Sequence, residues 1–360
     1  MGSLTRANMI MIMLLALHAT LTPFLAISSD MSIINNYEEE GDSMELGFVR
    51  SEEEMKHLFE EWMVRYDKSY NTLQERQRRL SIFKDNLRLI DEHNRPSNNH
   101  TYTLGLNHFA DLSNEEFQST YLGFRPSNIT ELMSTPTIGR RQHVTRKGRD
   151  LIPDSLDWRD KGAVTPVKSQ GKCASCWAFV AVATVESLNY LVTGDLITLS
   201  EQQLVDCDQG NKGCDPGYIF KAYNHIKHNG IDTDEHYPYV SGIYFFYNLV
   251  VWIFKVNVVS IDGFHLMRRH PIDEEDMKEA VAKQPSSVGI KGENPEFRFY
   301  KSGVFAGPCS GVLNHAVTLV GYGIGERRED YWLAKNSWSN GWGEDGYARI
   351  ARGNPREQDG

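Results

Sequence analysis

The chain of 360 residues has little positive charge, with 38 lysines and arginines against 48 aspartates and glutamates. Its formal net charge is −10 and its sequence pI is about 5.7. This balance argues against a general nucleic-acid-binding protein, which would need an excess of basic side chains. Internal repeats and low-complexity tracts are also lacking in the sequence. A chain of this length can bury two or more hydrophobic cores.

Long hydrophobic runs are equally scarce. The run Met9–Leu17 is too short to cross a bilayer. It follows Arg6 and precedes small residues near Ala26, an order typical of a secretory signal peptide. We therefore expect a signal peptide over residues 1–26 and no membrane association after its removal. A start-anchored membrane protein is the alternative.

Two Asn-x-Thr sequons, at Asn99 and Asn128, are consistent with secretion and predict glycosylation. The secretory pathway also places the cysteines in an oxidising compartment, where disulfides persist. We expect the protein to end in a vacuole, a lysosome or the extracellular space.

Cysteines are few, and Cys176 is the most informative of the five. It begins the apolar segment Cys176–Val192, whose Ala, Val and Leu residues recur at helical spacing. A thiol at a helix N-terminus is a candidate nucleophile, because the helix dipole favours the reactive thiolate. Cys173 and Cys176 also form a Cys-x-x-Cys pair, but the βαβ pattern that accompanies a redox site of this kind is not visible.

Three more residues can complete a catalytic site around Cys176. His315 can hold the thiol proton, and the side-chain oxygen of Asn336 can accept a hydrogen bond from the other ring nitrogen. The side-chain amide of Gln170 and the backbone N–H of Cys176 can stabilise the oxyanion that forms when a peptide carbonyl is attacked. Taken singly, His315 would more simply be a core histidine, so the interpretation depends on the set.

The run Gln170–Phe179, followed by His315 at 139 residues and Asn336 at 160 residues after Cys176, resembles the papain and cathepsin family, especially its plant members. In that family the His and Asn lie about 130–150 residues downstream of the Cys, and we ascribe the longer interval to Asn336 to loop-length variation. The resemblance implies an α+β fold of two domains. A helical left domain would carry Cys176, and a β-barrel-like right domain would carry His315 and Asn336.

The sequence pattern changes in the same sense. Helical periodicity dominates from Ser175 to about Asn229, and short β-prone runs separated by glycines follow Val258. These runs are Val258–Ile261, Val304–Phe305, Ala316–Val320, Tyr331–Ala334 and Tyr347–Ile350.

A second motif precedes the first. Seven residues recur mostly at steps of three and four and so line one face of a predicted helix. They are Glu75, Arg79, Ile82, Phe83, Asn86, Ile90 and Asn94. This set resembles the interspersed Glu-Arg-Phe-Asn-Ile-Asn signature of papain-family propeptides. The run Gly105–Asp111 matches the Gly-x-Asn-x-Phe-x-Asp motif that follows it in the family. The resemblance implies a small helical domain whose C-terminal extension crosses the active-site cleft and keeps the enzyme latent.

These motifs divide the chain into five segments. The expected segments are a signal peptide (1–26), an N-terminal pro-segment (27–54), a propeptide inhibitor domain (55–125), a linker with the maturation cleavage (126–150) and a papain-like peptidase domain, C-terminally truncated relative to the family (151–360). The linker is polar, with prolines and basic residues, and such exposed segments are cleaved most easily. We place the mature N-terminus between Leu151 and Pro153.

Four cysteines besides Cys176 allow three disulfide pairings. The resemblance pairs Cys173 with Cys214 and leaves Cys207 and Cys309 without their family partners, so we expect both to be unpaired. Where one partner should lie, the chain instead has the apolar run Ile243–Phe254. This run is a buried strand or binding surface, a mis-joined coding segment, or the mark of a decaying gene, and we favour the second explanation.

Substrate contacts are implied by the resemblance at six positions: Gly217, Tyr218, Gly289, Asn314, Ala316 and Trp338. Gly289 lies where the family has a small apolar residue, which predicts a roomy apolar S2 pocket. Two departures act on the approach of the substrate. Ala174 adds a methyl group where the family has Gly, and Pro216 stiffens its loop and removes a donor.

We therefore expect a cysteine endopeptidase made as a zymogen, which hydrolyses peptide bonds through an acyl-enzyme in general or vacuolar/lysosomal protein degradation. No metal or cofactor is implied. The expected partners are protein and peptide substrates, the chain's own propeptide and cystatin-like inhibitors, and the expected state is a monomer. The alternative, favoured by the missing cysteines, is an inactive papain-like relative or a propeptide-type protease inhibitor.

Overall fold

The computed structural model describes residues 50–126, 152–242, 258–267, 273–308 and 311–353. The predicted signal peptide, the maturation linker, Asn128, Cys309 and the apolar run Ile243–Phe254 lie outside the described residues, apart from the linker's first residue. The domain boundaries predicted from the sequence therefore remain predictions.

Residues 50–126 form the helical prodomain. Its elements are α2 (Glu52–Arg65), α3 (Leu73–His93), the 3₁₀ turn η1 (Pro96–Asn98), β1 (Tyr102–Leu104) and α4 (Asn114–Tyr121). The helices begin at capping side chains, since the Ser51 and Ser113 hydroxyls each accept the N–H three residues on. Packing of α2 on α3 buries an aromatic group, in which Phe59 and Trp62 contact Phe83 at ring-centroid distances of 5.3 and 5.4 Å.

The predicted signature face of α3 is confirmed, and each polar member has a partner. Arg79 joins Glu75 on its own helix to Glu116 on α4, with N–O distances of 2.6 and 2.7 Å. Asn94 pairs with the backbone of Leu104, because its side chain donates to the carbonyl and accepts from the N–H, both at 2.9 Å. The signature therefore joins α3 to the segments that follow it.

The helical half of the peptidase part consists of α7 (Cys176–Thr193), α8 (Glu201–Cys207) and α9 (Ile219–Asn229). Helix α7 is apolar and long enough to suit a membrane span by composition alone, yet 61% of it is buried inside the protein. It ends at Gly194, whose φ of 86° is the left-handed conformation that favours glycine. Trp177, Val182 and Val185 of α7 form a core with residues of α8 and α9.

The other half is built on a sheet, and the predicted α+β class is confirmed. The sheet order is β1-β4-β7-β6-β5-β2, and β3 also pairs with β5. The bounds are β2 Leu156–Asp157, β3 Ser286–Ile290, β4 Tyr300–Phe305, β5 His315–Ile324, β6 Asp330–Lys335 and β7 Tyr347–Ala351. The β-prone run Val258–Ile261 differs from the prediction, because it makes only an isolated bridge between Val259 and Ile231.

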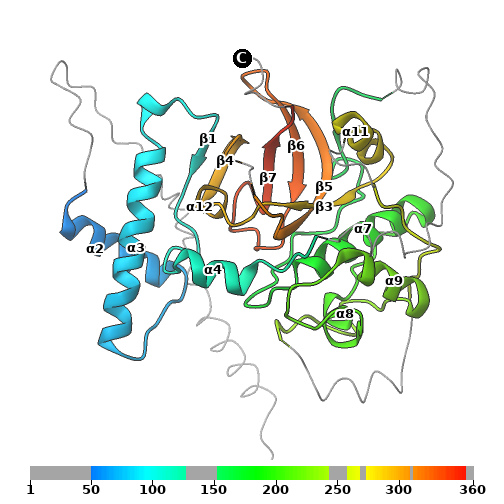
Figure 1. Cartoon of the computed structure of the whole chain (residues 1–360), viewed down its shortest axis with the longest axis horizontal. Helices are drawn as coiled ribbons and strands as arrows, with labels where there is room; N and C mark the ends of the chain where they lie inside the picture. The colour runs from blue at the N-terminus through cyan, green and yellow to red at the C-terminus, as the bar shows by residue number, and fades with distance from the viewer. Residues whose placement is uncertain (1–49, 127–151, 243–257, 268–272, 309–310, 354–360) are drawn as a thin grey trace, which may run out of the picture. The chain divides into compact units, whose positions relative to one another are not determined.

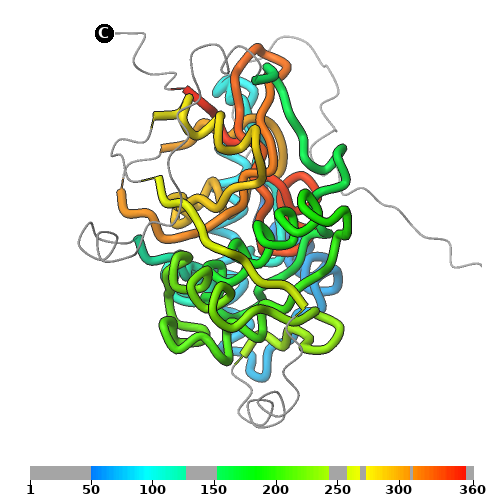
Figure 2. Tube along the Cα trace, turned by 90° about the vertical axis from the view of Figure 1, so that its right-hand side faces the viewer, coloured from blue at the N-terminus to red at the C-terminus, as the bar shows by residue number. Residues whose placement is uncertain are grey.

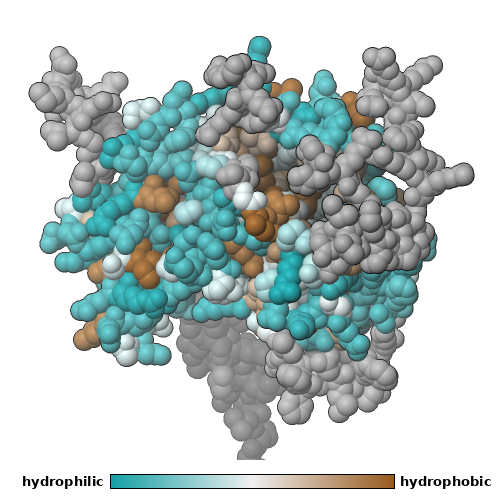
Figure 3. Space-filling view, viewed as in Figure 1, coloured by the Kyte–Doolittle hydropathy of each residue, from teal (hydrophilic) through white to brown (hydrophobic). Residues whose placement is uncertain are grey.

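Figure 1 shows α2 and α3 on one side of the sheet and α7, α8 and α9 on the other, and Figure 2 shows most of the green helical segment below the orange strands and in contact with them. Two further helices, α11 (Glu274–Lys283) and α12 (Pro295–Arg298), belong to the second half. The face drawn in Figure 3 is largely hydrophilic, with hydrophobic residues gathered near its middle.

The prodomain is joined to the peptidase part by a strand pair and by one buried arginine. Strand β1 pairs antiparallel with β4. Arg298, which is 2% exposed, donates from Nη2 to Asn86 Oδ1 (2.8 Å) and from Nη1 to the carbonyls of Leu112 and Ser113 (both 3.2 Å). Asn86, a residue of the propeptide signature, thus bonds directly to the peptidase part.

The predicted disulfide between Cys173 and Cys214 is present, with a Cα–Cα distance of 4.8 Å. Cys207, the last residue of α8, is half-buried. Because Cys309 is outside the described residues, the lack of disulfides at Cys207 and Cys309 remains a prediction.

We predict that Arg298→Ala and Asn86→Ala each destabilise the docked prodomain. Removing one partner of a buried hydrogen bond to a charged group typically costs about 1.5–3 kcal/mol. The double variant should lose less than the two single losses together, because both remove the same contact. Thermal unfolding of the full chain at neutral pH measures the effect.

Arg327→Ala is the matched control, since Arg327 donates to Asn99 of the prodomain at an exposed site and should matter little. Strictly additive losses for Arg298 and Asn86 would contradict the direct coupling.

Candidate active site

Cys176 is the first residue of α7 and is completely buried. It packs with Val180 and Ala316, and the backbone N–H groups of Ala316 and Gly123 are directed at its sulfur. Burial raises the pKa of the thiol to about 12, although these N–H groups oppose the effect. In this state the thiol is protonated and is a poor nucleophile.

His315, the first residue of β5, lies next to Ala316 and is also fully buried. Its Nε2 is 2.8 Å from Asn336 Oδ1, and the Ser337 N–H donates to the same oxygen at 2.8 Å. Since Asn336 Oδ1 is an acceptor, Nε2 carries the ring proton. Nδ1 makes no hydrogen bond to any described residue, so it is the nitrogen left to take a proton. The indole of Trp338 stacks on the imidazole at 4.4 Å.

Burial lowers the pKa of His315 to about 4, and the hydrogen bond to Asn336 opposes this only in part. A neutral imidazole therefore accompanies the neutral thiol of Cys176. The site therefore contains a candidate nucleophile, a candidate base and an orienting amide, with the thiol and the imidazole both neutral.

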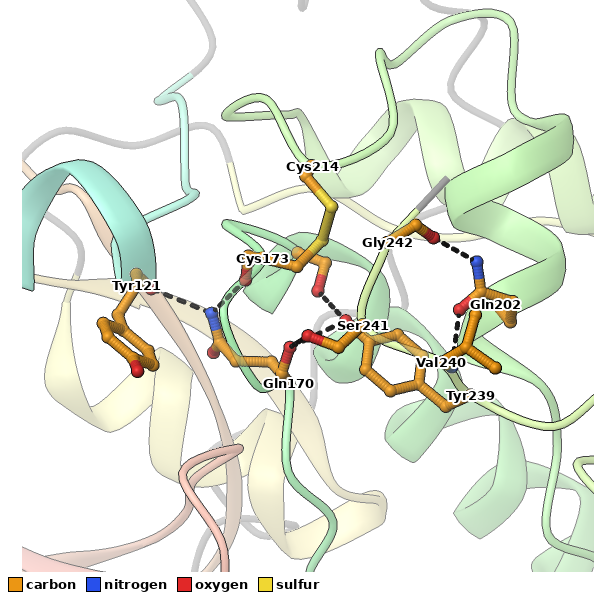
Figure 4. Close-up of a disulfide and its surroundings, with 10 residues drawn as sticks. Tyr121, Gln170, Cys173, Gln202, Cys214, Tyr239, Val240, Ser241 and Gly242 are labelled. Carbon is orange, nitrogen blue, oxygen red and sulfur yellow. Dashed lines mark hydrogen bonds between the residues drawn. A yellow bond between two sulfur atoms is a disulfide. The ribbon is translucent and has the colours of Figure 1, made fainter. Parts of the chain in front are cut away.

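Gln170 is fully buried, and its amide orientation is fixed on both sides. Its Oε1 accepts the Ser337 hydroxyl at 2.7 Å, and its Nε2 donates to the carbonyls of Tyr121 (2.9 Å) and Cys173 (2.8 Å). Figure 4 shows the bond from Gln170 to Tyr121 of the prodomain. The side-chain donor that the sequence predicts for an oxyanion is thus engaged by a prodomain carbonyl.

The prodomain runs through the site as an extended strand. The Gly217 N–H donates to the Gly123 carbonyl (2.8 Å), and the Arg125 N–H donates to the Gly217 carbonyl (2.9 Å). The Phe124 N–H donates to the Asn314 carbonyl at 3.0 Å. Two of the predicted substrate contacts therefore bind a peptide backbone here.

The Phe124 side chain packs against a small apolar group formed by Cys176, Val180 and Ala316. Its ring lies over Gly289, where a Cβ would overlap it. Gly289 and Ala316 are directly opposite each other on β3 and β5, so the two small residues leave room for the ring.

Comparison with known proteins identifies the family. A model described as papain family cysteine protease matches residues 152–359, and one described as cathepsin propeptide inhibitor domain (I29) matches residues 59–117. The chain belongs to the papain family of cysteine proteases.

Two curated relatives of this papain-family protease, both from plants, show the degree of similarity. The cysteine proteinase RD21A of Arabidopsis thaliana is 46% identical over 339 residues, which cover 91% of this chain and 69% of the relative. Chymopapain of Carica papaya is 43% identical over 312 residues, which cover 84% of this chain and 83% of the relative.

Solved structures of precursors match the described fold, prodomain included. The recombinant stem bromelain precursor is 41% identical with a TM-score of 0.72 and covers 83% of this chain and 92% of its own. The proform of the ragweed pollen cysteine protease Amb a 11 is 38% identical with a TM-score of 0.73 and covers 84% of this chain and 90% of its own.

Not every predicted residue of the protease lies against the prodomain strand. Tyr218 makes its contacts with Asn211, Phe220 and Lys221, and Trp338 shields His315 while contacting Phe109 and Phe117 of the prodomain. Ala174, which replaces the family's glycine, contacts the prodomain through its backbone, because its carbonyl faces Gly123.

A buried charged cluster, absent from the sequence prediction, holds the end of β6, which directly precedes Asn336. Lys168 donates to Glu186 (3.1 Å) and Glu201 (2.7 Å), and burial raises the pKa of Glu201, while the charge of Lys168 opposes this. Lys335, next to Asn336 in the chain, donates to Thr165 at 2.9 Å, and Thr165 donates to Glu186 at 2.5 Å.

Among the described residues, no group of three or more His, Cys, Asp or Glu side chains could hold a metal ion.

We predict that Gly123→Ala abolishes the shielding of Cys176 in the zymogen, because a Cβ at position 123 would overlap the Ala174 carbonyl. The wild-type thiol, with its raised pKa, should react slowly with iodoacetamide at neutral pH and faster as the pH rises. The variant should react faster at neutral pH, where rates of alkylation of the full chain are compared.

Gly105→Ala is the control, because its Cβ would meet only the flexible side chain of Lys301. If Gly123→Ala were alkylated as slowly as the wild type, the close approach of the strand to the thiol would be wrong.

Proposed function

We propose that Cys176, His315, Asn336 and Gln170 carry out peptide hydrolysis in this papain-family endopeptidase. The observation that carries the proposal is His315, which bonds Asn336 through Nε2, leaves Nδ1 without a bond to any described residue, and directly precedes Ala316, which packs against Cys176. Asn336 orients His315 and is itself held by the Ser337 N–H. Gln170 and the Cys176 N–H supply donors for the oxyanion.

The reaction then follows from this arrangement. The Cys176 thiolate attacks the peptide carbonyl, and the proton it gave to His315 passes to the leaving amine as the C–N bond breaks. Water, deprotonated by His315, attacks the acyl-enzyme and releases the acid product with the thiol. Removal of the prodomain lets water reach the sulfur, which cancels the desolvation that raises its pKa. The helix dipole of α7 then favours the thiolate.

The prodomain strand also indicates how a substrate binds. An extended peptide can take the Gly217 N–H and carbonyl and the Asn314 carbonyl that now bind residues 123–125. Because the Phe124 ring fills the space over Gly289 and beside Ala316, we infer an S2 pocket that accepts large apolar side chains, aromatic ones included.

Processing and location extend the proposal. A signal peptide over residues 1–26 would direct the chain to the secretory pathway, and cleavage within residues 126–150 would release the mature enzyme in a vacuole, a lysosome or outside the cell. Asn99 is exposed, in keeping with a glycosylated sequon. We also propose a monomer that cystatin-like inhibitors block at the cleft.

Acid is proposed to loosen the prodomain through Glu296 of α12. The Tyr102 hydroxyl donates to its carboxylate, and His93 Nδ1 lies 3.8 Å from Oε1. The interaction with His93 lowers the pKa of Glu296, and the hydrogen bond from Tyr102 adds to this, while burial opposes it. Because the docked state lowers this pKa, the carboxylate stabilises docking at pH values above its ordinary pKa. The stabilisation is lost as the pH falls from the ordinary pKa through the lowered one.

We predict that Cys176→Ala abolishes hydrolysis of peptide amides by the acid-treated chain while the fold is retained. Cys176→Ser should also fail, because the alkoxide is much harder to form than the thiolate. Cys207→Ala serves as the control and should keep its activity. Residual turnover of Cys176→Ala within about tenfold of wild type would contradict the nucleophile, and an inactive wild type would favour the inactive-relative alternative.

We predict that Glu296→Gln weakens latency at neutral pH and flattens the acid dependence of activation, because an amide does not titrate and attracts His93 less. The measurement is the rate of activation of the full chain between about pH 6 and pH 3, which includes the ordinary carboxylate pKa and the range below it, where the stabilisation is lost. Glu279→Gln, which removes the surface ion pair with Lys283, should behave as wild type. An unchanged acid dependence in Glu296→Gln would exclude this carboxylate.

A further inference from the structure

The hydroxyl of Tyr239 bridges two separate parts of the active-site loop. It donates to the backbone carbonyl of Gln170 at 2.8 Å and lies 2.8 Å from the hydroxyl of Ser175. The two partners are 69 and 64 residues away in sequence. Figure 4 shows Tyr239 and Ser241 beside Gln170, with the Cys173–Cys214 disulfide nearby.

The two bridged residues adjoin the two proposed oxyanion donors. Gln170 supplies one donor from its own side chain, and Ser175 immediately precedes Cys176, whose backbone N–H is the other. The separation of the donors therefore depends on how the backbones of residues 170 and 175 are held relative to each other. The geometry of such donors decides how well they stabilise a developing oxyanion.

Ser175 gives an independent sign that its hydroxyl serves this bridge. It occupies the N-cap position of α7, where a serine side chain usually accepts a backbone N–H of the first turn. Here the side chain makes no capping hydrogen bond and pairs with Tyr239 instead. Tyr239 has one hydroxyl proton, which it donates to Gln170, so Ser175 is the donor to Tyr239.

Tyr239 is itself held rigidly. Its ring packs edge-on against Phe179 of α7, with centroids 4.8 Å apart and planes at 82°. Ser241 adds a second donor to the Gln170 carbonyl at 3.1 Å. Gln202 of α8 brackets the segment, because its Oε1 accepts the Val240 N–H (2.9 Å) and its Nε2 donates to the Gly242 carbonyl (2.6 Å).

We propose that Tyr239 is a positioning residue of the oxyanion hole, whose hydroxyl sets the spacing between the Gln170 side-chain amide and the Cys176 N–H. The role differs from that of Ser337, which orients only the Gln170 amide group. The inference rests on the proposed function of Gln170 and adds the group that holds both donors in register.

The test uses the full chain after acid treatment and compares Tyr239→Phe with wild type in two reactions. Hydrolysis of a peptide amide passes through an oxyanion, whereas alkylation by iodoacetamide, followed at Cys176 itself, only displaces iodide with the thiolate. In Tyr239→Phe we expect kcat to fall about tenfold, less than the loss of a whole oxyanion donor, with KM changed by less than about twofold. The alkylation rate and its pH profile should stay as in wild type.

Tyr237→Phe is the matched control. Tyr237 lies two residues before Tyr239, and its hydroxyl donates instead to Asp206 Oδ2 at 2.8 Å. Its kcat should equal that of wild type. A kcat for Tyr239→Phe within about twofold of wild type would overturn the proposal, as would an equal fall in hydrolysis and alkylation. Should Tyr239→Phe fail to fold, Ser241→Ala removes the other donor to the Gln170 carbonyl. A smaller fall in kcat for Ser241→Ala, with the alkylation rate unchanged, supports the positioning of the Gln170 backbone by this clamp of Tyr239 and Ser241. An unchanged kcat refutes it.

Gln170→Ala separates the premise from the inference. If Gln170→Ala keeps full kcat, the proposed oxyanion role of Gln170 is wrong and the clamp has no function to serve. If Gln170→Ala loses kcat but Tyr239→Phe does not, the oxyanion role stands and only the positioning role of Tyr239 fails.

Discussion

The packing of α7 against β5 is the contact on which the site depends. Cys176 begins the helix and His315 begins the strand, and both ends meet at Ala316, which is completely buried between them. A larger side chain at 316 would hold the two halves apart, because the interior is close-packed and has no slack for added atoms. The small residue therefore limits the separation of Cys176 and His315, the proposed nucleophile and base, which the chain supplies from opposite halves.

Latency follows from competition for the same groups. The prodomain strand binds the Gly217 backbone, the Asn314 carbonyl and the Gln170 side-chain amide, all of which the proposed mechanism gives to a substrate. The strand also keeps water from the thiol, which raises its pKa. Inhibition by this competition needs no distortion of the proposed catalytic residues.

Much of the site could be predicted because its residues carry distinctive side chains in fixed order. Local sequence pattern predicted three of its features: Cys176 at the start of a helix, His315 beside Ala316, and the signature face of α3. Gly123 and Phe124 were not singled out, since a strand held by backbone hydrogen bonds leaves few side-chain signals. Arg298 and Tyr239 act over long separations in sequence, and a single chain without its fold gives no sign that Arg298 meets Asn86 or that Tyr239 meets Gln170.

The pairing of β1 with β4 has a consequence for the life of the enzyme after maturation. Strand β4 now lies between β1 and β7, so departure of the prodomain turns it into an edge strand with unpaired N–H and carbonyl groups. Edges of this kind recruit other chains unless they are blunted. Strand β4 is short, carries the exposed Lys301 and has Gly303 at a φ of 95°, features that disfavour further strand addition. The same edge that receives the prodomain is thus built to resist self-association once it is vacated.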